Sequence, residues 1–259
     1  MKSKLKIVKI GGNIIEDPNT LDALLGRFAG LDGLKILVHG GGKRATEIEN
    51  RLGISSEYYK GRRITSRESL DVMIMVYGGL VNKEITAVLQ AKQCNAIGLS
   101  GADGGTILAH KRPVQEVDFG LAGDIDRINE TTVIKLLQSN LVPVFCALTH
   151  NGSGQILNTN ADTIASELAI GLSSHYDTTL YYCFEKKGVL RDLNDEDSVI
   201  RHIDKNIYKE LITQNLISDG MLPKLHNCFR ALESDVSKIC IGNMNMLEPD
   251  AELFTSISL

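Results

Sequence analysis

A short apolar strand that runs directly into a lysine and two glycines, at residues 4–12 (KLKIVKIGG), places the strongest constraint on the fold. Its large, mostly β-branched apolar residues are typical of a strand buried on both faces. Lys9 interrupts the run just before Gly11 and Gly12. Paired glycines after a strand can adopt positive φ and bring N–H groups close to a ligand, and a lysine beside them suits a phosphate. A surface lysine followed by a tight turn is the alternative, and this stretch alone leaves both interpretations open.

A second strand with a glycine-rich end follows one helix later. Asp17 and Pro18 are typical of the N-cap and first residue of a helix, and residues 34–38 (LKILV) form the next apolar strand. That strand ends in residues 39–42 (HGGG), which lead into another helix and so place backbone amides at a helix N-terminus, where anions bind. Parallel strands end at one sheet edge, so two glycine-rich ends predict a ligand site there. Each loop could instead be a tight turn that needs glycine for packing.

Strands and helices alternate through the rest of the chain. Thr65 and Glu68 form a predicted capping box for a helix to about Gln93, with a glycine pair inside it as a point where the helix can kink. Lys224 follows a proline that is typical of a first helical turn, where a lysine is unfavourable unless an anion binds. The expected hairpins are at residues 58–65, 107–123 and around 151–154, and the further strands are at 96–99, 141–148, 178–184 and 238–241, the last of these being the final strand.

Composition and motif spacing exclude several classes of function. The net charge of −4 argues against broad nucleic-acid binding, and the glycines match neither the P-loop nor the G-x-G-x-x-G spacing. No apolar run approaches the roughly 18 residues of a membrane helix, and no signal-peptide core is visible, so we expect no membrane contact. The five cysteines are scattered and without a C-x-x-C, which indicates reduced thiols in a cytoplasm. The six histidines are dispersed, so no metal site built from side chains is expected.

Five motifs occur in an order that resembles the amino acid kinase family. They are residues 9–12 (KIGG), 39–42 (HGGG), 61–65 (GRRIT), 158–162 (NTNAD) and 219–224 (DGMLPK). The resemblance extends from residue 6 to about residue 241. It implies an α/β fold, a three-layer αβα sandwich around a mainly parallel sheet of about eight strands, with residues 1–259 forming a single domain. Residues 1–175 would bind an acyl-amino acid and residues 176–259 would bind ATP.

Within this family the motifs are similar to those of members that phosphorylate the γ-carboxylate of an N-acylated L-glutamate in arginine biosynthesis. The resemblance implies ATP with Mg²⁺ held mainly by the nucleotide phosphates, and a homodimer, while the net charge already argues against a nucleic-acid partner. The sequence leaves open whether the acyl group is acetyl or succinyl. A carbamate or aspartate type of kinase, or a ligand-sensing member without catalysis, is the alternative. The first strand begins near residue 4, without the helical extension of arginine-inhibited members, so we expect no inhibition by arginine.

The resemblance assigns roles to individual residues. Lys9 and Lys224 would stabilise the transferring phosphoryl group, and Asp162 would hold both lysines. Gly41, Gly42, Arg63 and Asn158 would bind the acyl-amino acid, with Arg63 on its α-carboxylate. The residues expected at the nucleotide are Gly11, Gly12, Glu185, Lys186, Lys187, Gly188, Val189, Leu190, Leu216, Ile217 and Ser218.

The residue types suit this chemistry. A carboxylate nucleophile is already ionised at neutral pH and needs no general base, so charge stabilisation of the transferring group is the main requirement. Each assignment has a structural alternative: Arg63 as a surface cation beside Arg62, Asp162 as a helix cap, and Asn158 as an Asx-turn residue. Family members usually carry Ser/Thr-Asp-Val-x-Gly where this chain has residues 184–188 (FEKKG), and the usual Gly-Thr ending is missing.

Overall fold

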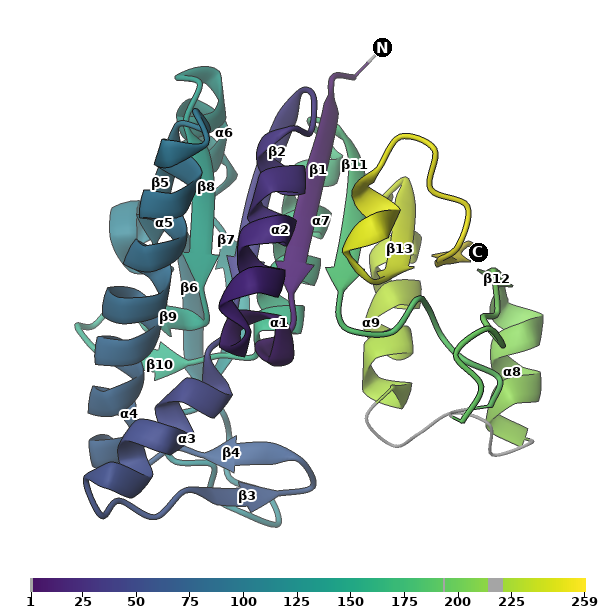
Figure 1. The fold of residues 1–259 in the computed structure, drawn as a ribbon. Helices are drawn as coiled ribbons and strands as arrows, with labels where there is room; N and C mark the ends of the chain where they lie inside the picture. Colours follow the sequence, from purple (N-terminus) through teal and green to yellow (C-terminus); the bar gives the residue numbers. More distant parts are fainter. Residues whose placement is uncertain (1, 193, 214–220) are drawn as a thin grey trace.

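The computed structural model describes residues 2–192, 194–213 and 221–259. A central sheet of eight strands, in the order β12-β14-β13-β11-β1-β2-β8-β5, runs through the molecule (Figure 1). Neighbouring strands are parallel except β13 and β14, which are antiparallel. The expected mainly parallel sheet is therefore confirmed. The strands are β12 (His202–Ile203), β14 (Thr255–Ile257), β13 (Lys238–Gly242), β11 (Asp177–Cys183), β1 (Lys4–Ile10), β2 (Leu34–His39), β8 (Val142–Cys146) and β5 (Ala96–Leu99).

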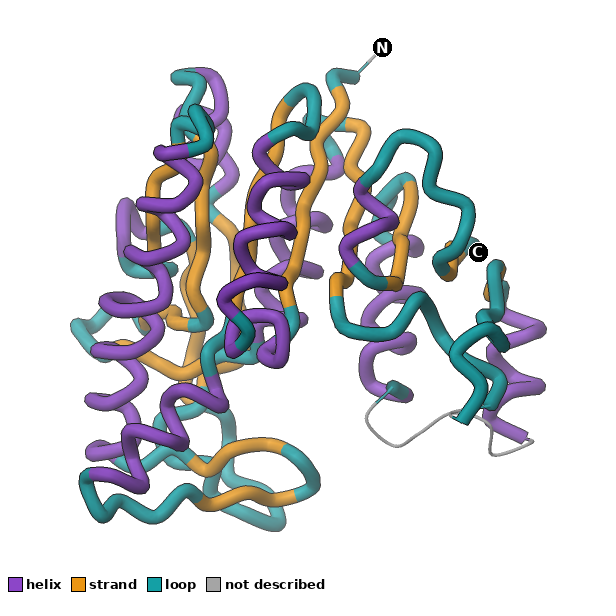
Figure 2. Tube along the Cα trace, viewed as in Figure 1, coloured by secondary structure: helices purple, strands orange, loops and turns teal. Residues whose placement is uncertain are grey.

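Helices cover both faces of this sheet and complete the αβα sandwich, as Figure 2 shows. One face packs against α1 (Gly12–Glu16), α2 (Pro18–Ala29) and the long helical stretch that ends with α5 (Asn82–Ala91). The other face packs against α6 (Glu130–Gln138), α7 (Ala161–Ser173), α8 (Lys205–Thr213) and α9 (Leu222–Glu233). Near the C-terminus, η3 (Met244–Leu247) adds to the first face.

The two-residue period of β1 decides where its lysine points. Leu5 and Ile7 belong to the core beneath α7 and α9, whereas Val8 and Ile10 belong to the core beneath α1 and α2. Successive side chains of a strand alternate between faces, so Lys9 lies on the same side as Leu5 and Ile7. The strand therefore directs the ammonium group of Lys9 toward the N-termini of α7 and α9.

Two smaller sheets lie within residues 1–175, the half that is expected to bind the acyl-amino acid. The hairpin β3 (Glu57–Tyr59) and β4 (Arg62–Ile64) forms where it is expected and lies beside α3 (Gly42–Arg51) in Figure 1. A four-stranded sheet has the order β10-β9-β6-β7. The hairpin predicted at 107–123 forms, but its second strand begins at Gly123 instead of ending there. The strands are β6 (Ile107–Lys111), β7 (Gly123–Ile128), β9 (Leu148–His150) and β10 (Ile156–Asn158).

The long helical stretch departs from its prediction at both its start and its middle. Ser66, not Thr65, is the N-cap of α4 (Arg67–Met73), because the Ser66 hydroxyl accepts from the Ser69 N–H. Thr65 instead pairs its backbone with the segment at residues 119–121. The glycine pair lies within a π-helical turn, η1 (Ile74–Val81), that joins α4 to α5. A π turn widens the helix by one residue, so the stretch continues without a break.

The same stretch, Arg67–Ala91, corrects the expectation about membrane-length apolar runs. It is long and apolar enough, by length and composition alone, to cross a bilayer, although 44% of its most apolar window is buried inside the protein. A core helix of a water-soluble protein passes the same criterion. Its buried residues, including Leu70, Met73 and Leu89, pack in the core on the α1 and α2 face of the sheet.

Several short elements were not predicted from the sequence. The prediction that the chain's last strand spans 238–241 is wrong, because β14 follows it and inserts between β13 and β12. These two strands have three and two residues, too few for an alternating pattern to be recognised. The five-residue helix α1 was likewise hidden, because its sequence begins with a glycine of the predicted turn.

Candidate active site

Three charged side chains from three different elements meet at the ends of the strands. Lys9 Nζ lies 2.6 Å from one carboxylate oxygen of Asp162, and Lys224 Nζ donates to the other at 2.7 Å. Lys9 comes from β1, Asp162 from the first turn of α7 and Lys224 from the first turn of α9. Their side chains are only 13%, 20% and 17% exposed. The structure therefore brings together all three residues expected at the phosphoryl group, and Lys9 is not a surface lysine.

The three charges strongly perturb one another. Burial raises the pKa of Asp162, but the charges of Lys9 and Lys224 and their hydrogen bonds lower it by more, so its pKa lies well below the ordinary range. Burial also lowers the pKa of Lys9, as does the charge of Lys224, while Asp162 opposes this shift. With both lysines protonated, the cluster carries one net positive charge in a largely buried position. Such a position favours an anion.

The helix-cap alternative for Asp162 is wrong. Asn160 is the N-cap of α7, and its side chain accepts from the N–H groups of Asp162 and Thr163. The carboxylate of Asp162 is therefore not needed at the helix end. Asn160 therefore stabilises the first turn of α7, and the Asp162 carboxylate, two residues later, remains available to pair with the two lysines.

The two glycine-rich loops differ in geometry. Gly11 has a φ of −73°, and its N–H donates to the Cys183 carbonyl at 2.9 Å, so the expected positive φ and free amide are absent there. Gly12 begins α1, and a Cβ built on it would meet no atom within 4 Å. Gly41 has a φ of 148°, and a Cβ built on it would lie 2.9 Å from Tyr77 Cδ1. Gly42 begins α3. Only the second loop therefore requires glycine for its backbone conformation.

The side chain of Arg63 lies largely inside the protein, so the surface-cation alternative is wrong. Its side chain is 7% exposed and pairs with Glu49, which is fully buried. The guanidinium also stacks over the Tyr58 ring, 4.8 Å from the ring centre. Both terminal amino groups donate to protein oxygens, which belong to Glu49, Ser56, Thr46, Tyr58 and the Gly42 carbonyl. Among the described residues, only its Nε–H has no acceptor.

Asn158 lies at the end of β10 and reaches across the chain rather than to its own turn. Its side-chain amide donates to the Thr65 hydroxyl at 3.0 Å, and its backbone N–H donates to the Leu121 carbonyl. Thr65 follows β4, the strand that carries Arg63. This contact does not fit an Asx-turn, and it links the 158–162 motif to the 61–65 motif.

The expected nucleotide loop is tied down by its neighbours. Lys186 pairs with Glu196 and Lys187 with Asp197, each at 2.6 Å. The Val189 N–H donates to the hydroxyl of Thr255, which in turn donates to the Ile200 carbonyl. The side chains of Val189 and Leu190 are buried, and Gly188 lies close against Thr255 and Val199. Leu216, Ile217 and Ser218 lie outside the described residues.

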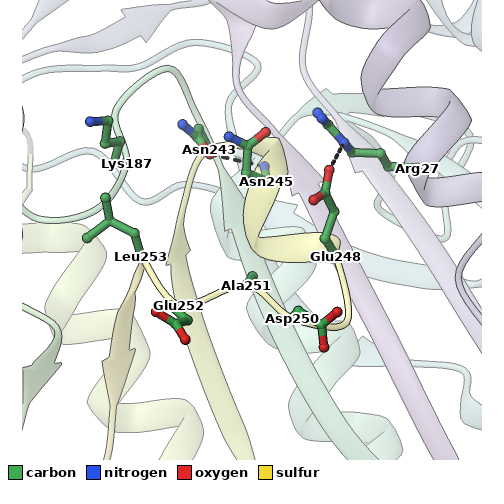
Figure 3. Close-up of a pocket in the computed structure, with 9 residues that line it drawn as sticks. All are labelled: Arg27, Lys187, Asn243, Asn245, Glu248, Asp250, Ala251, Glu252 and Leu253. Carbon is green, nitrogen blue, oxygen red and sulfur yellow. Dashed lines mark hydrogen bonds and ion pairs between the residues drawn. The ribbon is translucent and has the colours of Figure 1, made fainter.

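Two neighbouring cavities open beside this loop. The larger, of about 460 Å³, contains Lys187, Asn243 and Asn245 and an ion pair between Arg27 and Glu248 (Figure 3). The other, of about 400 Å³, shares the two asparagines and is bordered by Phe184 and Glu185. Neither is bordered by the three charges described above. Glu49, Tyr77, Thr255 and these asparagines were missed by sequence reasoning, because no motif or spacing marks them.

A fold and site of this kind define a class of protein, and comparison with known proteins agrees. The model of the Amino acid kinase family matches residues 4–243, and the chain belongs to that family. The particular relatives are named acetylglutamate kinase. The one from Phocaeicola vulgatus is 54% identical over 93% of this chain and 94% of its own length. The one from Methanopyrus kandleri is 34% identical over 94% of this chain and 96% of its own.

Solved structures share the fold at much lower identity. Carbamate kinase from Giardia lamblia, bound to AMP-PNP, has a TM-score of 0.67 at 15% identity, with 99% of this chain and 98% of that chain covered. N-acetylglutamate synthase from Neisseria gonorrhoeae, in complex with coenzyme A and N-acetyl-glutamate, has a TM-score of 0.84 at 19% identity. That match covers 100% of this chain and 60% of the other. The predicted family and fold class are confirmed.

Proposed function

We propose that this protein transfers the terminal phosphoryl group of ATP to the γ-carboxylate of N-acetyl-L-glutamate, forming an acyl phosphate for arginine biosynthesis. The supporting observation is the Lys9–Asp162–Lys224 cluster, whose net positive charge is enclosed at the strand ends. The names and identities of the curated relatives point to the same substrate.

The cluster suits a reaction that needs charge stabilisation rather than a base. The γ-carboxylate of the substrate is ionised at neutral pH, since such groups titrate near ~4.3. Phosphoryl transfer spreads negative charge over the equatorial oxygens and onto the leaving oxygen. Lys9 and Lys224 would stabilise that charge from two sides, and Asp162 would fix their separation against mutual repulsion.

The acyl-amino acid would bind beside the second glycine loop. Gly41 is the N-cap of α3 and Gly42 its first residue, so their backbone amides lie where an anion is favoured, and Arg63 donates to the Gly42 carbonyl. Asn158 connects to the same hairpin through Thr65. These residues belong to the half at 1–175, which we assign to the amino-acid substrate.

ATP would bind over the half at 176–259. Gly12 and residues 185–190 lie at the ends of β1 and β11, where the two neighbouring cavities open. Because the Gly11 N–H donates to the Cys183 carbonyl, Gly11 would allow the ends of β1 and β11 to pack closely instead of binding phosphate. Among the described residues, no group of three or more His, Cys, Asp or Glu could hold a metal ion. Mg²⁺ would neutralise phosphate charge and would be held mainly by the nucleotide phosphates.

Two alternatives are less well supported. A carbamate or aspartate type of kinase shares the fold, but the relatives at 46–54% identity are named acetylglutamate kinase. A sensor without catalysis would not need both lysines on Asp162. A coupled assay of ADP release with N-acetyl-L-glutamate, N-succinyl-L-glutamate, aspartate and carbamate separates these functions. Release that depends on N-acetyl-L-glutamate supports the proposal, whereas release with aspartate or carbamate alone, or none at all, contradicts it.

The assembly and location are part of the same proposal. An exposed apolar strip on η1, formed by Ile74, Met75 and Leu80, is suited to a second copy of the chain, so we assign a homodimer. The five cysteines are all buried and free, which agrees with a reducing cytoplasm.

A further inference from the structure

Tyr77 lies against the second glycine loop although no motif includes it. The nearest contacts of a Cβ built on Gly41 would be Tyr77 Cδ1 at 2.9 Å and Cε1 at 3.1 Å, and one built on Gly42 would lie 3.7 Å from the Tyr77 hydroxyl. The ring therefore runs along Gly41 and ends at Gly42. Tyr77 belongs to the π turn η1, and such turns often occur at functional sites because they shift side chains out of the regular helical register.

The hydroxyl is the part of Tyr77 that remains available. The residue is 4% exposed, and among the described residues its hydroxyl has no hydrogen-bond partner. Yet this oxygen is not among the fully buried atoms that lack a partner. The small exposed area of Tyr77 therefore includes its hydroxyl. Burial raises the pKa of Tyr77 to about 12, while the charge of Arg63 opposes the shift, so the hydroxyl keeps its proton at neutral pH.

The guanidinium of Arg63 explains why a second donor is needed there. Its two terminal amino groups already donate to protein oxygens, including Glu49 and the Gly42 carbonyl. Only Nε–H lacks an acceptor among the described residues, so Arg63 can serve one oxygen of a carboxylate without losing a bond. The other oxygen of a substrate α-carboxylate would need a donor from another element.

We infer that the Tyr77 hydroxyl binds the α-carboxylate of the N-acylated glutamate, as a partner of Arg63. This inference rests on the proposed function and adds a substrate-binding residue to it. The donor comes from η1, the charge comes from β4 and the backbone amides come from α3. Groups from three elements would therefore bind the α-carboxylate, so the site would bind substrates with an α-carboxylate more tightly than analogues without one.

The test is Tyr77→Phe, which keeps the ring that packs on Gly41 and removes only the hydroxyl. The KM for N-acetyl-L-glutamate should rise roughly tenfold, as expected for one hydrogen bond to a charged group, with kcat and the KM for ATP within about twofold. Tyr181→Phe is the matched control, because burial also raises the pKa of Tyr181 to about 12 and it lies in β11, away from the loop. Thermal unfolding of both variants should match that of the wild type.

A substrate without the α-carboxylate tests the assignment itself. With 4-acetamidobutyrate, wild type and Tyr77→Phe should show equal KM values, however weak. An unchanged KM for N-acetyl-L-glutamate, or a penalty that persists with 4-acetamidobutyrate, would overturn the inference. Calorimetric measurement of N-acetyl-L-glutamate binding tests the Tyr77 contact independently of the proposed kinase activity. If the wild type shows no turnover but Tyr77→Phe weakens binding, the contact is supported and the kinase activity is contradicted. Absence of both binding and turnover would overturn both.

Discussion

At the scale of single residues, Arg63 combines a structural and a binding role. Its pairing with buried Glu49 holds α3 against β4, and its Nε–H is the donor left for the proposed substrate. Arg63→Lys keeps the charge but removes the Nε–H donor and the contacts that hold the guanidinium in place, so we expect the KM for N-acetyl-L-glutamate to rise by about tenfold or more while the KM for ATP stays nearly constant. Arg62→Lys, at the exposed neighbour, is the control. Weaker ATP binding with an unaffected acyl substrate would place Arg63 in the wrong half.

The residue scale also shows how far sequence reasoning reached. The meeting of Lys9, Asp162 and Lys224 was implied by the resemblance to the amino acid kinase family, whose motifs contain all three residues. The partners of Arg63 could not be predicted, since Glu49 and Thr46 lie on an amphipathic helix with no signal of their own. The amide of Gly11 was assigned to a ligand, but it bonds to Cys183, a contact fixed only by the pairing of β1 with β11.

At the scale of elements, His39 joins the end of β2 to α5. Its Nε2 lies 3.0 Å from the Asn82 amide nitrogen, and its Nδ1 lies 2.7 Å from the Gly40 carbonyl. An amide nitrogen can only donate, so Nε2 accepts and Nδ1–H donates. The neutral ring therefore connects the glycine loop to the helix that follows the π turn.

This connection predicts a dependence of stability on pH. Burial lowers the pKa of His39 to about 4, so the unfolded chain, with a pKa near ~6.5, binds more protons than the folded one between these values. The neutral His39 ring therefore makes its full contribution to the free energy of unfolding above about pH 6.5. This contribution is lost as the pH falls toward 4, with a loss on the order of 2 kcal/mol by pH 5. Urea unfolding at pH 7 and pH 5 measures it. His39→Gln should lose less stability over that interval than the wild type, and an equal loss would refute the assignment.

Element boundaries show where the sequence was insufficient. The buried strands and most helices follow from apolar patterns, but the π turn does not, because its apolar residues fit a regular helix equally well. Thr65 was expected as a cap, yet tertiary pairing with residues 119–121 holds it in an extended conformation and Ser66 takes its place. Local capping preferences were overridden here by a contact with a distant segment.

At the scale of the whole molecule, the exposed apolar strip on η1 predicts the assembly. Met75 is 57% exposed beside Ile74 and Leu80, and covering such a strip with a second copy removes it from water. Light scattering should give the mass of a dimer. Met75→Lys should shift it toward a monomer, because the dimer would bury an unpaired charge. Val114→Lys, at a residue 62% exposed elsewhere, should leave the mass unchanged. A monomeric wild type would contradict the assignment.

The central claim is that the Lys9–Asp162–Lys224 cluster stabilises the transferring phosphoryl group. The most direct measurement is kcat, with both KM values, for Lys224→Ala, with Lys205→Ala on α8 as the control for an exposed ion pair. We expect kcat to fall roughly 10²–10³-fold while the KM values change much less, as for an interaction made mainly in the transition state. Circular dichroism verifies folding. A folded Lys224→Ala protein with near-wild-type kcat would contradict the account.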